Sequence, residues 1–191
     1  MIRLNNYKQY VFYGYLTIAV NILTGFILFP LIIKHLGLEA LGVFGIFFSL
    51  KSIFDIVISG TNSGITKNLL KYKHLKSSIF TFSLFFSLFY GILGLLFFNM
   101  YGLYFKEAYF YVSFYFGLYV LFNFVTNAFY QMMIATSKQH VVSFFRFLQQ
   151  ILFFLLTVPI FYFFELKSLD DVFLGLFASS VIVFVLLFIY Y

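Results

Sequence analysis

The sequence predicts an all-α integral membrane protein, and three observations lead to that class. Of the 191 residues, 63% are hydrophobic and only 9% are charged, whereas a soluble domain carries about 25% charged residues. Several apolar stretches reach the length of about 20 residues that a membrane-spanning helix needs. Segments such as Val181–Tyr191 are apolar on every face, unlike the alternating strands of a membrane barrel. These observations exclude a soluble enzyme, a nucleic-acid-binding protein and a disulfide scaffold as descriptions of the whole chain.

Six apolar stretches predict six membrane-spanning helices in a single membrane domain that covers residues 1–191. The helices are expected at residues 10–33, 40–59, 77–98, 108–135, 141–164 and 171–191. The first stretch is longer than the apolar core of a signal peptide, and no small-residue cleavage site follows it. We therefore expect an uncleaved helix at the N-terminus.

The distribution of basic residues predicts the orientation of these helices. If the helices alternate across the membrane from a cytoplasmic N-terminus, eight of the twelve basic residues fall on the cytoplasmic side: Arg3, Lys8, Lys67, Lys71, Lys73, Lys76, Lys138 and Arg146. The other side holds Lys34, Lys106 and Lys167, with Glu107 and Glu165 beside them. Because cytoplasmic loops carry an excess of Lys and Arg, both termini are expected in the cytoplasm. The net charge of +6 then reflects orientation, and no nucleic-acid partner is expected.

The longest basic stretch, Thr66–Ser78, follows the second predicted helix. On a helix, Lys67, Lys71 and His74 would share one face. The stretch is compatible with a short helix that lies on the anionic inner leaflet, or with a loop whose charges set the orientation.

Two charged residues lie one helical turn apart inside the second predicted helix. A charge in mid-membrane costs about 2.5–3.5 kcal/mol and is a functional hypothesis by default. Lys51 and Asp55 are compatible with an internal ion pair that neutralises itself. They are equally compatible with a charge pair that lines an aqueous cavity, where Asp55 would couple transport to an ion.

Three predicted helices carry polar stripes. The residues are Asn123, Asn127 and Gln131 in the fourth helix, Thr17, Asn21 and Thr24 in the first, and Ser143, Arg146 and Gln150 in the fifth, where Gln149 lies beside the stripe. Such stripes can hold helices together, at roughly 0.6 kcal/mol per hydrogen bond. Because three helices carry one, we expect a shared hydrated cavity.

Arg146 is the most specific of these polar residues. Its guanidinium suits bidentate recognition of phosphate. It lies only a few residues inside its predicted helix, so its side chain could instead extend to the inner headgroups.

The third predicted helix carries small residues along one stripe, at Ser83, Ser87, Gly91 and Gly94. Small residues let helices approach closely in lipid, so we expect tight packing of this helix against another.

No chemistry of catalysis or metal binding is evident in the sequence. The chain has no cysteine, and its three histidines fall at helix ends or in loops. We therefore expect no metal, no cofactor and no enzymatic activity.

Several motifs follow one another in the first seventy residues. Phe29-Pro30 closes the first predicted helix, Leu36-Gly37 forms a turn, Gly42-Val43-Phe44 opens the second helix, and the small-residue segment from Gly60 to Lys67 leads into the basic stretch. In this order the motifs resemble the start of Wzx-type polysaccharide flippases of the multidrug/oligosaccharidyl-lipid/polysaccharide (MOP) exporter superfamily. The segment 129–150 is similar to the family's link between its fourth and fifth helices. Ser59 stands where the family often has an acidic residue.

The resemblance implies transport of an undecaprenyl-diphosphate-linked oligosaccharide across the bacterial inner membrane, for synthesis of surface polysaccharide such as O-antigen or capsule. It also implies a fold of two six-helix lobes that work by alternating access. The chain corresponds to the first lobe, and a second lobe or a second copy is the implied partner, with membrane lipids around it. In that setting Arg146 and Lys51 would balance the diphosphate. The amides, at Asn21, Asn123, Asn127, Gln131 and Gln150, would replace water around sugar hydroxyls.

Three other functions stay open at this level. A cation-coupled drug exporter of the same superfamily often has an acidic residue in its first helix, which is absent here. An O-antigen polymerase typically needs a large outer loop with arginines, and the predicted outer loops are short and contain none. A truncated, inactive remnant or a membrane scaffold is the third alternative.

Overall fold

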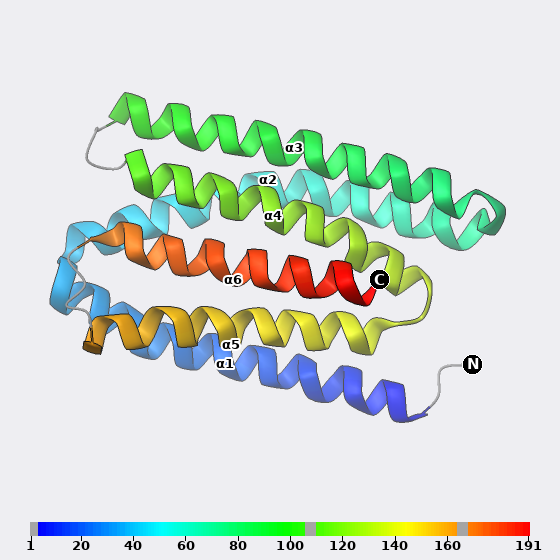
Figure 1. The fold of residues 1–191 in the computed structure, drawn as a ribbon, viewed down its shortest axis with the longest axis horizontal. Helices are drawn as coiled ribbons and strands as arrows, with labels where there is room; N and C mark the ends of the chain where they lie inside the picture. The colour runs from blue at the N-terminus through cyan, green and yellow to red at the C-terminus, as the bar shows by residue number, and fades with distance from the viewer. Residues whose placement is uncertain (1–3, 106–109, 164–167) are drawn as a thin grey trace.

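The computed structural model describes residues 4–105, 110–163 and 168–191. These residues form six long α-helices and one short 3-10 turn, with no strand among them (Figure 1). In chain order the elements are α1 (Leu4–Leu36), α2 (Leu38–Lys71), η1 (Lys73–Leu75), α3 (Lys76–Phe105), α4 (Phe110–Ala135), α5 (Gln139–Phe163) and α6 (Leu169–Tyr190). All six α-helices are long and apolar enough to cross a membrane. The predicted class, an all-α multi-pass membrane protein, is confirmed.

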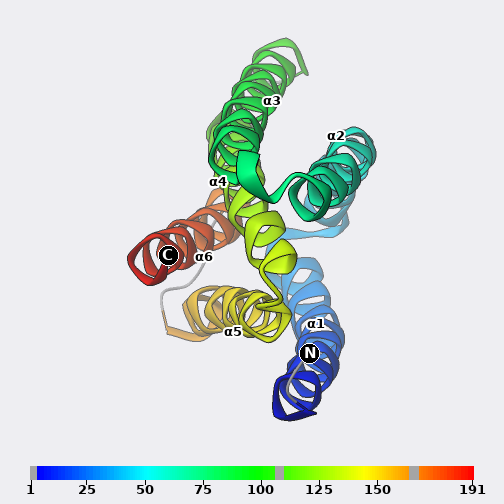
Figure 2. The same ribbon diagram turned by 90° about the vertical axis from the view of Figure 1, so that its right-hand side faces the viewer.

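Successive helices run in opposite directions, so both termini lie at the same end of the bundle (Figure 1). We call this end the terminal end and the opposite one the far end. Figure 2 looks onto the terminal end and shows α4 in the middle of the bundle. α4 packs against α2, α3, α5 and α6, whereas α1 packs mainly against α5. The central position of α4 places its polar stripe within reach of several other helices.

One residue joins α1 to α2 at the far end. Gly37 has φ of +88°, a conformation that glycine adopts without steric cost. Its N–H donates to the carbonyl of Ile33 at 3.1 Å, which closes the last turn of α1. The Leu36-Gly37 pair is therefore the predicted turn, and it holds the far ends of α1 and α2 together.

α2 is longer than the sequence predicts. The pattern indicates an end near Ser59, but α2 continues to Lys71 and spans 34 residues. The hydroxyls of Thr61 and Ser63 donate to carbonyls one turn earlier, so these residues stay within the helix and do not cap it. At 1.5 Å per residue α2 is about 51 Å long, and its last turns extend beyond a hydrocarbon core of about 30 Å.

This length excludes the first alternative for the basic stretch and shortens the loop of the second. Its first half, up to Lys71, is the end of α2, and only the 3-10 turn η1 separates α2 from α3. A separate α-helix on the inner leaflet does not form, and the loop is shorter than expected. Two other predicted ends also differ, since α1 begins at Leu4 instead of residue 10 and α3 ends at Phe105 instead of residue 98. The predicted ends at residues 108 and 164 lie outside the described residues, as do Arg3, Lys106, Glu107, Glu165 and Lys167.

Aromatic side chains close the far half of the bundle. The Phe116 ring of α4 lies 4.8 Å from Phe98 of α3, 5.2 Å from Phe173 of α6 and 5.3 Å from Phe47 of α2, measured between ring centroids. All four side chains are fully buried, and the three contacts are edge-to-face, an arrangement that aromatic rings favour. Four helices are thus joined through one apolar cluster near the far end.

The small residues of α3 face α4, as predicted. Ser83 and Ser87 are 1% exposed, and a Cβ atom on Gly91 would lie only 3.1 Å from the Cα of Leu121. α4 also contributes a glycine to this contact, because a Cβ atom on Gly117 would lie 3.1 Å from the Cα of Leu95 in α3. The two backbones approach more closely here than larger side chains would allow.

Candidate functional site

A polar cleft of about 410 Å³ opens between α2, α4 and α5. It lies between the middle of the bundle and the terminal end, on the side of the aromatic cluster that faces the terminal end. Nine of its ten lining residues are polar or charged: Lys51, Asp55, Ser59, Asn62, Ser63, Asn123, Asn127, Gln131 and Arg146, with Ile58 as the exception. We call it the charged cleft. Because polar side chains at membrane depth are costly, their convergence on one cleft makes it the candidate site.

Six of the eight residues predicted for the site line this cleft: Lys51, Asp55, Asn123, Asn127, Gln131 and Arg146. The stripe on α4 faces the cleft because its members recur every four residues and so share one face of the helix. The α4 stripe and Arg146 of α5 thus line one cleft, together with residues of α2.

Lys51 and Asp55 form the ion pair that their spacing predicts. The Lys51 Nζ donates to both carboxylate oxygens of Asp55, at 2.7 and 2.9 Å. The Lys51 side chain is 11% exposed and that of Asp55 is 45% exposed. The Nζ also lies 5.8 Å from the centre of the Tyr119 ring, a cation–π contact. The two residues form an ion pair and also line the cleft, so the geometry leaves both interpretations of this pair open.

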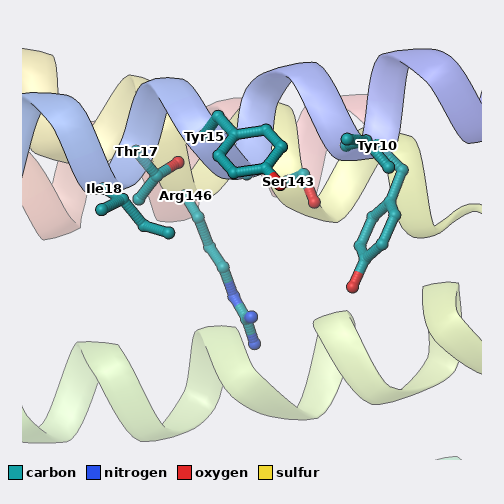
Figure 3. A pocket seen from close by; sticks show the side chains of 8 residues that line it. Tyr10, Tyr15, Thr17, Ile18, Ser143 and Arg146 are labelled. Atoms are coloured by element: carbon teal, nitrogen blue, oxygen red, sulfur yellow. The ribbon is translucent and has the colours of Figure 1, made fainter.

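Arg146 points into the bundle. Its guanidinium lies 5.4 Å from the centre of the Tyr130 ring on α4, and Figure 3 shows the side chain extending away from α1. Within the described part of the chain no carboxylate forms an ion pair with Arg146. The charged cleft therefore carries one net positive charge, since Asp55 offsets only Lys51.

Arg146 also borders a second hollow, of about 390 Å³, between α1 and α5. Figure 3 shows this second hollow, which is lined by Tyr10, Tyr15 and Thr17 of α1 and by Ser143 of α5. Arg146 thus borders two hollows, the charged cleft and this second one.

Some of the polar residues hold helices together. The Thr66 hydroxyl of α2 donates to the Gln131 Oε1 of α4, and the Gln149 Nε2 of α5 donates to the Ser180 Oγ of α6 at 2.9 Å. For Gln149 the structural reading is correct, because this side chain is absent from the lining of the cleft. Gln131 both joins α4 to α2 and lines the cleft.

Sequence reasoning missed the contribution of α2 beyond Ser59. Asn62 is 8% exposed and lines the cleft together with Ser59 and Ser63. Asn62 follows Lys51 by eleven residues, or about three helical turns, which places both on one face. A longer second helix would have revealed this stripe.

The remaining two predicted residues lie elsewhere. Asn21 of α1 and Gln150 of α5 line a separate pocket of about 420 Å³ nearer the far end. Among the described residues the three stripes therefore do not line a single cleft: the α1 stripe meets the α5 stripe instead, with Thr17 beside Ser143 and Arg146 in one hollow and Asn21 and Thr24 beside Gln150 in the other. The hydroxyls of Thr17 and Thr24 donate to their own helix, at 2.7 Å in both cases, and α2 takes the place of α1 in the charged cleft.

Among the described residues no group of three or more metal-ligating side chains could hold an ion. No family model matches the chain, and comparisons with curated proteins and with solved structures give no match.

Proposed function

We propose that the protein moves a polyprenyl-diphosphate-linked oligosaccharide from the inner to the outer leaflet of a bacterial cytoplasmic membrane. The observation that carries this proposal is the unbalanced positive charge of Arg146 in a polar cleft at membrane depth. A membrane protein retains such a charge at a cost, and an anionic ligand would offset it. The motif order of α1 and α2 points to the same class of cargo.

The chemistry of the cleft suits a diphosphate. The Arg146 guanidinium offers paired N–H donors to phosphate oxygens. Asn62, Asn123 and Asn127 add neutral donors and acceptors that would replace water around a polar headgroup. The hydrocarbon tail would stay in the bilayer, beside the apolar outer faces of the helices.

The orientation proposed from the charges agrees with the arrangement of the helices. Lys8, Lys67, Lys71, Lys76 and Lys138 belong to helix ends or connections at the terminal end. We place this end, with both termini, in the cytoplasm. The charged cleft then lies toward the leaflet in which the lipid-linked saccharide is assembled.

A cation-coupled exporter is the second candidate, and Asp55 is the observation that favours it. This carboxylate lines the cleft and is 45% exposed. A dependence of transport on a proton or sodium gradient that Asp55→Asn removes would support coupling. Transport of small cationic drugs without transport of the lipid-linked saccharide would favour the exporter.

The decisive experiment is reconstitution of the chain into liposomes that contain a polyprenyl-diphosphate-linked oligosaccharide. A membrane-impermeant glycosidase added outside reports saccharide that reaches the outer leaflet. We expect Arg146→Gln to slow transfer by about 10- to 150-fold, because charge-assisted hydrogen bonds contribute about 1.5–3 kcal/mol. Arg146→Lys should restore part of the rate, since it keeps the charge without the paired donors.

Lys138→Gln is the matched control. It removes a positive charge that lies over the Tyr190 ring at the terminal end, outside the cleft, and should leave the rate unchanged. Transfer by Arg146→Gln at the full rate, with equal protein, would contradict a role for Arg146 in binding.

A further inference from the structure

The pocket nearer the far end differs in chemistry from the charged cleft. Its lining combines aromatic rings with two amides, and no charged side chain is among the described residues that line it. The amides belong to Asn21 and Gln150, and the rings include Phe44, Phe48 and Tyr119. The Phe48 ring lies 4.6 Å from Phe44 and 6.5 Å from Tyr119, between centroids. We call this hollow the neutral pocket.

The neutral pocket is a neighbour of the charged cleft. Tyr119 lines the pocket, and its ring faces the Lys51 ammonium of the cleft at 5.8 Å. On α5, Gln150 follows Arg146 by four residues, about 6 Å along the helix axis. On α4, Tyr119 precedes Asn123 by the same spacing. A ligand that extends from the cleft toward the far end would enter the pocket past the Lys51–Tyr119 contact.

A pocket of this composition suits a sugar ring. A hexose presents C–H groups on its faces and hydroxyls around its edge. Aromatic rings cover apolar faces, and each amide of Asn21 and Gln150 offers both donors and an acceptor to hydroxyls. A few convergent polar groups in an otherwise apolar pocket are typical of a small-molecule site. A diphosphate finds no positive charge among the lining residues, so it would remain in the charged cleft.

We propose that the neutral pocket is the subsite for the first sugar of the lipid-linked oligosaccharide, while the diphosphate occupies the charged cleft. This inference rests on the proposed function. The first sugar is bonded directly to the diphosphate, so the two subsites must be neighbours, as they are. The sugar then precedes the diphosphate toward the far end, which is the direction of transfer.

The test compares the affinity of the reconstituted chain for two probes, a polyprenyl diphosphate and the same lipid with a disaccharide attached. The wild-type chain should bind the saccharide-bearing lipid more tightly. Gln150→Leu should lower the ratio of the two affinities about fivefold, the effect of one lost hydrogen bond. Gln149→Leu is the matched control, because the neighbouring Gln149 bonds Ser180 and does not line the pocket. It should leave the ratio unchanged.

A second variant reports on the pocket without removing a polar group. The chain contains no tryptophan, so Phe48→Trp places a single indole in the neutral pocket. The emission of this indole should shift when the saccharide-bearing lipid is added, and should not shift with the polyprenyl diphosphate that carries no sugar. The control Phe89→Trp, on an exposed face of α3, should respond to neither.

The outcomes separate the two proposals. Equal affinity of the wild-type chain for both lipids, or a ratio that Gln150→Leu leaves intact, would overturn the saccharide subsite while the transport function stands. An indole at position 48 that responds equally to both lipids would show that a lipid chain fills the pocket, and would also overturn it. Failure to bind either lipid would overturn the proposed function and this inference together.

Discussion

At the scale of single residues, the Lys51–Asp55 pair is asymmetric. The side chain of Lys51 is 11% exposed and held between Asp55 and the Tyr119 ring, whereas that of Asp55 is 45% exposed toward the cleft. Loss of either partner leaves the other charge unpaired. Water in the cleft would solvate a lone Asp55 carboxylate, but the lone Lys51 ammonium has little room for water.

We therefore expect Asp55→Asn to destabilise the protein more than Lys51→Met. The cost of Asp55→Asn should be about 2 kcal/mol, less than for a fully buried pair because Asp55 is partly exposed. Thermal unfolding in detergent measures both variants. The double variant should recover most of the loss. A double variant with the summed loss of the two single variants would contradict the pairing.

The same pair also separates structure from function in the transport assay. If its role is only to neutralise itself, the double variant transfers saccharide at the normal rate. If Lys51 or Asp55 takes part in binding or coupling, the double variant is stable but slow. Stability and rate together therefore assign the role that the spacing of the two residues leaves open.

At the scale of elements, the contact of α3 with α4 depends on the absence of side chains. A Cβ atom on Gly91 would lie 3.1 Å from the Cα and 3.3 Å from the carbonyl oxygen of Leu121, and one on Gly94 would lie 2.9 Å from the Val120 Cγ1. These neighbours of the Gly91 position are backbone atoms of Leu121, which can move only if the whole of α4 moves.

Gly91→Leu should consequently destabilise the folded bundle by about 1–3 kcal/mol, the range for overpacked sites. Gly60→Leu is the matched control, since a Cβ atom there has no neighbour within 4 Å and Leu has the better helix propensity. Folded yield and thermal unfolding in detergent compare the two. Equal stability of the two variants would contradict close packing of α3 on α4.

The elements also show where prediction from the sequence succeeds. Apolar length predicts six helices, and four-residue spacing predicts that Asn123, Asn127 and Gln131 share a face. The end of α2 is missed because Gly60, Thr61 and Ser63 look like a helix end. In the structure the hydroxyls of Thr61 and Ser63 bond within the helix. Which residues share a helix face can be predicted from their spacing alone. Where a helix ends depends also on what its last turns contact, and the sequence does not give those contacts.

Which helices share a cleft is beyond the reach of the sequence, because it depends on packing. α1 and α2 both carry polar residues, but α1 packs on α5 and α2 packs on α4. Asn21 is therefore placed in the neutral pocket and Asn62 in the charged cleft. Spacing along one helix cannot distinguish these outcomes.

At the scale of the whole molecule, the two halves of the bundle differ. The buried cluster of Phe47, Phe98, Phe116 and Phe173 joins four helices near the far end. The charged cleft lies on the other side of this cluster. The bundle is thus packed with apolar side chains toward the far end and lined with polar side chains on the side of the terminal end, which is the arrangement that the proposed transfer from the terminal end requires.

The direction of transfer depends on which end faces the cytoplasm, and this can be measured on intact cells. The chain has no cysteine, so single cysteines can be introduced at Leu38, which is 74% exposed at the far end, and at Leu75, which is 45% exposed in η1 at the terminal end. If the basic terminal end is cytoplasmic, a membrane-impermeant maleimide should label Leu38→Cys in intact cells. Leu75→Cys should be labelled only after the membrane is permeabilised. The reverse pattern would place the charged cleft toward the outer leaflet, and the proposed direction of transfer would then be wrong.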